Sequence, residues 1–135
     1  MIKWLAAGVG AAAVFTAGDF LWLTLMTPRL YRPALGPILA DRANIPAAVV
    51  FYLLYLAGVM VFGVAPGVGE RSWIRSLASG AFLGLVAYGT YDLTNQATLK
   101  VWSVKISLTD MGWGALITGL ASVAGCLAAL SAGKR

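Results

Sequence analysis

Four long apolar runs constrain this chain more than any other feature of its sequence. They cover residues 4–26, 46–66, 76–98 and 108–132, and each is long enough to cross a bilayer, which takes about 20 mostly apolar residues in a helix. Because the runs are apolar on every side, they do not fit the surface helices of a soluble domain. The chain is 60% hydrophobic and only 11% charged. We therefore predict a single membrane domain over residues 1–135.

Short connections between the runs predict an all-α bundle of four transmembrane helices in up-down-up-down order. The first run extends well past the about 7–15 residues of a signal-peptide core, so we expect it to span the membrane. The longest connection, residues 27–45, contains three of the five prolines, and a fourth, Pro46, directly follows it. Proline denies a continuous helix, yet the segment is too apolar for a freely solvated loop. We expect an interfacial segment, either a packed connector or a lid.

The positive charges do not decide which way the bundle faces. Orientation usually follows an excess of Lys and Arg in cytoplasmic loops, but here the two sides tie. Lys3, Arg71, Arg75, Lys134 and Arg135 fall on one side, and Arg29, Arg32, Arg42, Lys100 and Lys105 fall on the other. The net charge of +5 is spread over both faces, which predicts contact with anionic lipid headgroups and no nucleic-acid partner.

The residue inventory excludes most kinds of catalytic and cofactor site. The sequence contains no His and one Cys, which excludes His-ligated zinc or haem, Ser-His-Asp and Cys-His catalysis, and proton relays through His. Phosphate-binding loops, paired cysteines and dinucleotide motifs are also missing. We therefore expect no metal and no cofactor. Any chemistry must come from carboxylates, tyrosines, amides, hydroxyls and lysines.

Three of the five acidic residues lie inside the apolar runs or at their ends. Asp19 and Asp92 come a few residues before the ends of their runs, roughly 9–10 Å below the membrane surface at the rise of an α-helix. Asp110 lies near the start of the fourth run. Because successive runs alternate in direction, all three positions fall on the same side of the membrane. We therefore predict that the three carboxylates converge at one end of the bundle.

Polar and aromatic side chains share helix faces with these carboxylates, since residues three and four apart are neighbours on a helix. By this spacing Asp92 lies beside other polar residues of its run, while Asp19 and Asp110 each lie beside a tryptophan. The second run begins with two tyrosines on the same side. The resulting candidates for ligand binding or proton handling are Asp19, Trp22, Tyr52, Tyr55, Tyr88, Asp92, Asn95, Asp110 and Trp113. No catalytic role is assigned to them.

Structural roles remain open for several of these candidates. Asp110 follows Ser107 at the predicted start of a helix, where a carboxylate can cap amide groups. Asp92 lies in the last turns of its run, where a negative charge opposes the helix dipole. Ionisable groups inside a membrane cost about 2.5–3.5 kcal/mol on insertion scales and are functional by default, which favours a function for Asp92 and Asp19. The tyrosines fit an interfacial aromatic belt equally well, and Asn95 fits a helix-to-helix hydrogen bond.

No basic residue lies inside a run to neutralise Asp19 and Asp92. Two buried carboxylates close together cannot both stay ionised cheaply. We therefore expect one of this pair to be protonated, or the pair to share a proton or a cation. The expected hydrogen-bond partners are Tyr52, Tyr55, Tyr88 and Asn95.

Four sequence blocks together resemble one known family. They are "GDFLWL" in the first run, "FYLLYLAG" in the second, "YGTYDLTNQATLK" followed by Trp102 in the third, and "TDMGWG" in the fourth. They are similar to the bacterial membrane-protein family catalogued as domain of unknown function 2177, over nearly the whole chain. The resemblance implies a four-span protein of the bacterial inner membrane. Genes of that family often lie near those of fatty-acid-modifying enzymes, which implies lipid-modifying enzymes as partners.

Our leading hypothesis is that the chain binds or handles a lipid or small amphiphile at a carboxylate and tyrosine site in one membrane leaflet. The alternatives are a small transporter coupled to protons or cations, a membrane enzyme that modifies lipids, and an accessory or assembly protein. In the enzyme, Asp19 or Asp92 would be the general acid or base. Small residues spaced by four, such as Gly80 and Gly84, permit close helix approach and a homodimer.

Overall fold

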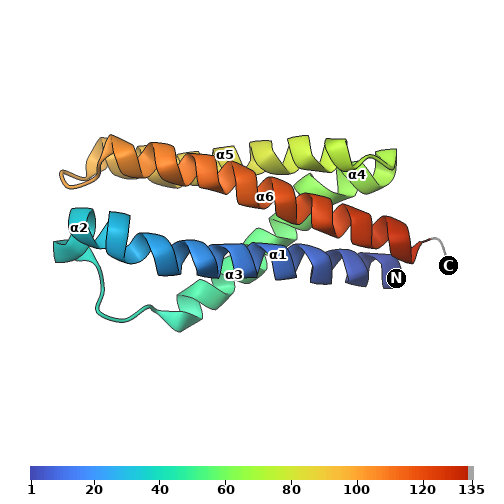
Figure 1. Ribbon diagram of the computed structural model, residues 1–135, viewed down its shortest axis with the longest axis horizontal. Helices are drawn as coiled ribbons and strands as arrows, with labels where there is room; N and C mark the ends of the chain where they lie inside the picture. The colour runs from blue at the N-terminus through green and yellow to red at the C-terminus, as the bar shows by residue number, and fades with distance from the viewer. Residues whose placement is uncertain (134–135) are drawn as a thin grey trace.

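The computed structural model describes residues 1–133, and nearly all of them are helical. The first helical rod consists of α1 (Ile2–Met26), the π-helical turn η1 (Thr27–Tyr31), α2 (Arg32–Leu35) and the 3-10 turn η2 (Gly36–Ile38). The second consists of α3 (Ile45–Gly58), the π-helical segment η3 (Val59–Val64) and α4 (Ala65–Glu70). The third and fourth are α5 (Trp73–Thr98) and α6 (Val104–Ala132). These rods alternate in direction, which confirms the predicted all-α, up-down-up-down membrane bundle (Figure 1).

Within residues 1–133, three helical segments are long and apolar enough to cross a membrane, namely Ile2–Ile38, Ile45–Glu70 and Val104–Ala132. The chain is therefore a multi-pass membrane protein. The predicted third span, α5, has the necessary length, but its many small and hydroxyl-bearing residues and Asp92 make it more polar than these three. It lies antiparallel beside α6 along the bundle (Figure 1).

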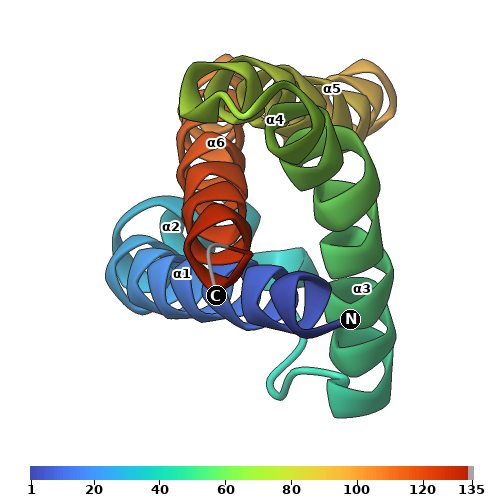
Figure 2. The same ribbon diagram turned by 90° about the vertical axis from the view of Figure 1, so that its right-hand side faces the viewer.

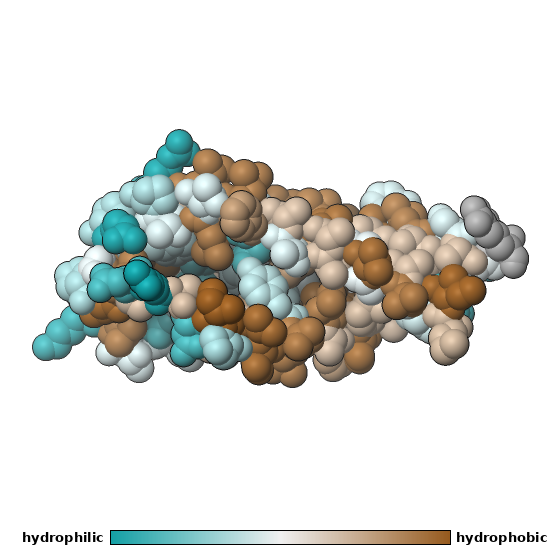
Figure 3. Space-filling model, turned by 90° about the horizontal axis from the view of Figure 1, so that it is seen from below, coloured by the Kyte–Doolittle hydropathy of each residue, from teal (hydrophilic) through white to brown (hydrophobic). Residues whose placement is uncertain are grey.

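Apolar side chains face outward along most of the molecule. Among the exposed ones are Phe20 on α1, Leu54 on α3 and Phe82 on α5. Hydrophilic residues gather instead at the end of the bundle where α1 ends (Figure 3). An apolar flank with a polar end is the surface that a bilayer requires, because lipid tails offer no hydrogen-bond partners.

The centre of the bundle is the contact of α6 with α5 and α1, the two helices that it touches most extensively. Small residues allow this contact. A Cβ atom added at Gly84 of α5 would collide with the backbone carbonyl of Gly114 on α6. Glycine at such positions lets helix backbones approach closely, and such close packing is one of the forces that hold helices together in lipid.

The first half of the second rod stands away from this core. No residue of α3 is buried, and α3 has few contacts with α1. In contrast, Val59, Gly63 and Val64 of η3 are buried, and η3 packs against α5 and α6. The rod therefore leaves the core at its π-helical segment, and α3 forms a separate side of the frame seen end-on in Figure 2.

The first connection is more helical than the sequence predicts. We expected its prolines to interrupt the chain, but residues 27–38 continue α1 as short helical turns. Pro28 and Pro33 are tolerated because each occupies the first turn of its segment, where an amide hydrogen has no partner to lose. Leu30 and Leu35 are buried there against Ile106 of α6. The segment is thus packed onto the bundle.

Two helices begin earlier than predicted because serine residues cap them. The Oγ of Ser72 accepts a hydrogen bond from the backbone amide of Arg75 at 3.2 Å, so α5 begins at Trp73 rather than at residue 76. The Oγ of Ser103 accepts one from the amide of Ile106 at 3.3 Å, so α6 begins at Val104 rather than at residue 108. Such caps satisfy amide groups that the first turn leaves free.

The close approach of α5 and α6 predicts an effect of adding one methyl group. Gly84→Ala should destabilise the protein by about 1–3 kcal/mol, since the backbone of Gly114 cannot yield like a flexible side chain. Gly8→Ala on α1 is the matched control, because a Cβ there meets no atom within 4 Å. Thermal unfolding in detergent micelles measures both. Equal midpoints for the two variants would contradict this account of the packing.

Candidate functional site

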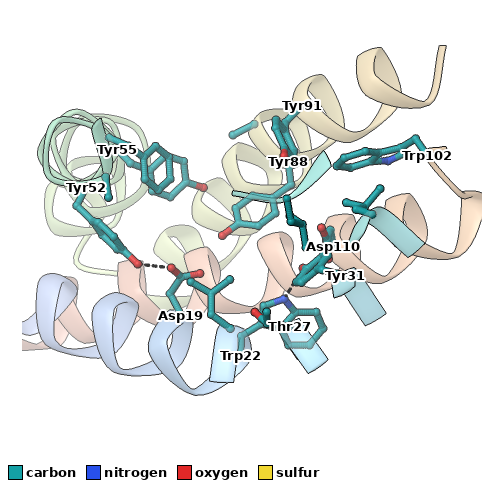
Figure 4. Close-up of a pocket in the computed structure, with 16 residues that line it drawn as sticks. Asp19, Trp22, Thr27, Tyr31, Tyr52, Tyr55, Tyr88, Tyr91, Trp102 and Asp110 are labelled. Atoms are coloured by element: carbon teal, nitrogen blue, oxygen red, sulfur yellow. Dashed lines mark hydrogen bonds between the residues drawn. The ribbon is translucent and has the colours of Figure 1, made fainter. Parts of the chain in front are cut away.

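A cavity of about 570 Å³ lies at the polar end of the bundle (Figure 4). It exists because α3 stands away from α1, so the space between α1, α3 and α5 is not filled by helix packing. Its polar and aromatic lining comes from all four rods and both connections at this end. These residues are Asp19, Trp22, Thr27, Tyr31, Phe51, Tyr52, Tyr55, Tyr88, Tyr91, Trp102 and Asp110.

The first carboxylate of the cavity, Asp19, joins α1 to α3. It is only 8% exposed, and its Oδ2 accepts a hydrogen bond from the hydroxyl of Tyr52 (Figure 4). One turn earlier on α1, Phe15 packs against Tyr52 and Tyr55, with ring centroids 6.0 and 4.9 Å away. Because α1 and α3 share few other contacts, this group of four side chains holds α3 in place.

The second carboxylate, Asp110, ends a chain of hydrogen bonds that begins at α1. The indole Nε1 of Trp22 donates to the hydroxyl of Tyr31 at 2.9 Å, and the same hydroxyl donates to Oδ1 of Asp110. The ring of Trp22 also stacks on Trp113, with centroids 4.5 Å apart and planes 7° apart. The helix-cap interpretation of Asp110 is therefore wrong, since Ser103 provides the cap of α6 and Asp110 faces the cavity instead.

The third carboxylate, Asp92, lies behind the cavity wall and is fully buried. Among the described residues, neither of its carboxylate oxygens has a hydrogen-bond donor. The carboxyl of Asp110, on the adjacent helix α6, lies close enough to interact with it, and Ser107, one turn before Asp110, donates to the backbone carbonyl of Asp92 at 3.4 Å. Two carboxylates in such contact repel each other unless one proton lies between them, as in a carboxyl dyad. A shared proton would give Asp92 the hydrogen bond that it otherwise lacks.

Asp19 and Asp92 have different partners in the structure from those that the sequence predicted. The sequence paired Asp92 with Asp19, whereas the structure places Asp92 against Asp110 and joins Asp19 to Tyr52. The reason is local: α5 and α6 lie in direct contact, while Asp19 faces α3 on the other side of the cavity. The hydroxyl of Tyr55, also expected near a carboxylate, instead bonds to Oγ1 of Thr118 at 2.8 Å.

Most of the predicted candidates line the cavity, and three do not. Asp92 and Trp113 lie behind the lining, and Asn95 lies further along α5. The sequence missed three lining residues: Tyr31 in the first connection, Trp102 in the α5–α6 turn and Tyr91 on α5. Spacing offered a signal for Tyr91 alone, because it lies three residues after Tyr88 on the same helix. Within residues 1–133, no cluster of His, Cys, Asp or Glu is arranged to hold a metal ion.

Comparison with known proteins gives one match. The sequence pattern of the family described as "Predicted membrane protein (DUF2177)" matches residues 4–127, which is nearly the whole chain. Neither a curated protein nor a solved structure matches the chain.

The bond between α1 and α3 predicts the effect of removing one hydroxyl. In Tyr52→Phe, α3 should lose roughly 1.5–3 kcal/mol of local stability, the usual contribution of a hydrogen bond to a charged group. Amide hydrogen exchange over residues 45–58 should then be about tenfold faster or more. Tyr91→Phe is the control, since Tyr91 is 59% exposed on the cavity rim. Unchanged exchange in Tyr52→Phe would show that this bond does not hold α3.

The contact of Asp92 with Asp110 predicts a protonated carboxyl group at neutral pH. Infrared spectra should show its carbonyl stretch, and the band should disappear in Asp92→Asn, where an amide can donate to Asp110 in place of the shared proton. The band should persist in Asp19→Asn, because Asp19 belongs to a different hydrogen bond. A band that responds to Asp19→Asn alone would support the pairing that the sequence suggested.

Proposed function

The chain belongs to that family of predicted membrane proteins, and we propose that it binds a lipid or small amphiphile of the membrane in the cavity at its polar end. The observation that carries this proposal is the composition of the cavity wall. Carboxylates and tyrosine hydroxyls lie together with a set of apolar side chains. These apolar residues are Leu23, Leu35, Leu39, Ala48, Phe51 and Ala87.

The size of the cavity suits a ligand rather than a few water molecules. Small-molecule sites in proteins measure about 300–1,000 Å³ and are mostly apolar with a few polar groups that fix orientation. The cavity of about 570 Å³ falls within that range. Its apolar wall would contact a hydrocarbon chain, while Asp19, Asp110 and the tyrosines would contact a headgroup.

The position of α3 gives such a ligand a lateral route from the membrane. Leu53 and Leu54 of α3 are 66% and 73% exposed and face outward, while Tyr52 and Tyr55 on the opposite side of the same helix line the cavity. The few contacts between α1 and α3 leave little packing to break when the two helices separate. An amphiphile that arrives in one leaflet would therefore enter without crossing the whole bilayer.

Proton-coupled transport is the second candidate function. It is favoured by one observation, the contact of buried Asp92 with Asp110, because Asp110 also lines the cavity and a ligand there would act on the shared proton. In both cases we place the protein in a bacterial inner membrane. Lipid-modifying enzymes are the partners that we propose for it.

Filling the cavity should abolish amphiphile binding. A photoreactive alkyl probe in nanodiscs should label Leu23, Leu39 and Phe51 in the wild-type protein. In Ala48→Trp the indole would occupy the cavity, and labelling should fall by about tenfold or more, equivalent to about 1.4 kcal/mol. Leu54→Trp, on the lipid-facing side of α3, is the matched control and should label normally.

Equal labelling of the two tryptophan variants would refute binding in the cavity. The position of the labels also separates binding from contact with bulk lipid. If labels appear only at outward positions such as Leu54, the probe marks the membrane and not a site.

A further inference from the structure

We propose that the amphiphile bound in the cavity carries a positively charged headgroup, a primary amine or a quaternary ammonium. This inference rests on the proposed function, because it names the chemical class of the ligand for that site. It is carried by the charge of the cavity wall and by the arrangement of the aromatic rings around it.

Acidic side chains give the wall of the cavity a negative charge. Asp19 and Asp110 both line the cavity, and Asp92 contacts Asp110 from behind. One proton shared between Asp92 and Asp110 would still leave that pair with one negative charge, and Asp19, when ionised as the acceptor of the Tyr52 hydroxyl, adds a second. The site is therefore anionic even when the carboxyl dyad holds its proton.

No basic side chain of the described lining offsets this negative charge. Among the described residues that line the cavity, none is a lysine or an arginine, and the one ion pair found in residues 1–133 joins Glu70 to Arg75 between α4 and α5. The hydroxyls of Tyr31 and Tyr52 donate to the carboxylates, but neutral donors leave the net charge unchanged. Buried charges are costly unless an opposite charge pairs with them.

Aromatic rings line the same cavity. The rings of Tyr55 and Tyr88 lie edge to face, with centroids 6.3 Å apart and planes at 71°. The rings of Tyr91 and Trp102 also lie edge to face, with centroids 5.4 Å apart and planes at 84°. Figure 4 shows the hydroxyls of Tyr55 and Tyr88 directed toward the middle of the cavity. Aromatic faces attract cations and form the cages that bind quaternary ammonium groups.

The acidic groups, the lack of a basic residue in the described lining and the aromatic rings together distinguish between anionic, neutral and cationic headgroups. A carboxylate or phosphate headgroup would lie beside the charges of Asp19 and Asp110 without a basic residue to offset the repulsion. A neutral headgroup would bind through hydrogen bonds but would leave both charges unpaired. A cationic headgroup would pair with the carboxylates and lie among the aromatic rings that line the cavity at the same time. The geometry therefore favours the cation over the other two classes.

The test uses three probes with the same dodecyl chain: dodecyltrimethylammonium, dodecanol and dodecanoate. Each competes with the photoreactive alkyl probe for the wild-type protein in phosphatidylcholine nanodiscs, with concentrations corrected for partition into empty nanodiscs. We expect dodecyltrimethylammonium to compete at about tenfold lower concentration than dodecanol, a difference of the size that one charge interaction supplies. Dodecanoate should be the weakest competitor.

A variant shows whether the carboxylate is the cause. Asp19→Asn keeps an oxygen that accepts the hydrogen bond of Tyr52 and removes the charge. It should weaken competition by the ammonium probe about tenfold and leave dodecanol unchanged. Asp41→Asn, at an exposed position of the first connection, is the control. In this variant the three probes should compete in the same order as in the wild-type protein.

The outcomes distinguish this inference from the proposed function. If dodecanol or dodecanoate competes as well as the ammonium probe, or if Asp19→Asn keeps the preference for the cation, the charge-based inference is wrong while the cavity remains a binding site. If no probe competes and Ala48→Trp labels like the wild type, the cavity binds no amphiphile and both proposals fail.

Discussion

The structure depends on one constraint: a carboxyl group inside a membrane must be paired, because lipid tails offer it neither water nor hydrogen-bond donors. Each of the three carboxyl groups at the polar end meets this constraint differently. Asp19 accepts a hydrogen bond from Tyr52, Asp110 accepts one from Tyr31, and Asp92, whose carboxylate has no donor among the described residues, lies beside the carboxyl of Asp110. These pairings tie α3, the first connection and α5 to the rest of the bundle, so the polar groups of the site also organise its walls.

The second requirement of the site is space, and the helix packing provides it. Gly84 and Gly114 bring α5 and α6 into backbone contact, which places Asp92 against Asp110 and excludes it from the cavity. On the other side, the π-helical segment η3 has three buried residues, Val59, Gly63 and Val64, while α3 has none. Close packing between α5 and α6 and the separation of α3 from α1 therefore produce the cavity with its acidic, aromatic wall.

The sequence predicted the features that follow from periodicity and direction, and missed those that follow from contact between distant segments. Four apolar runs predicted the rods, and alternation of direction predicted that Asp19, Asp92 and Asp110 gather at one end. Spacing along one helix carries no information about its neighbour, so the partner of Asp92 was predicted wrongly. Tyr31 was missed for a related reason: prolines made its segment look interrupted, whereas Pro28 and Pro33 lie in first turns where a helix tolerates them.

The most direct test of the central claim is an experimental structure of the protein in nanodiscs formed from its native membrane lipids. We predict elongated density along Leu23, Leu39 and Phe51 of the cavity wall, with its head beside the carboxyl groups of Asp19 and Asp110. We also predict that α3 remains apart from α1. The contrary result is an empty, collapsed site, in which α3 packs onto α1 and the tyrosine rings cover both carboxylates. That result would contradict ligand binding in the cavity, and the polar cluster would then only stabilise the bundle.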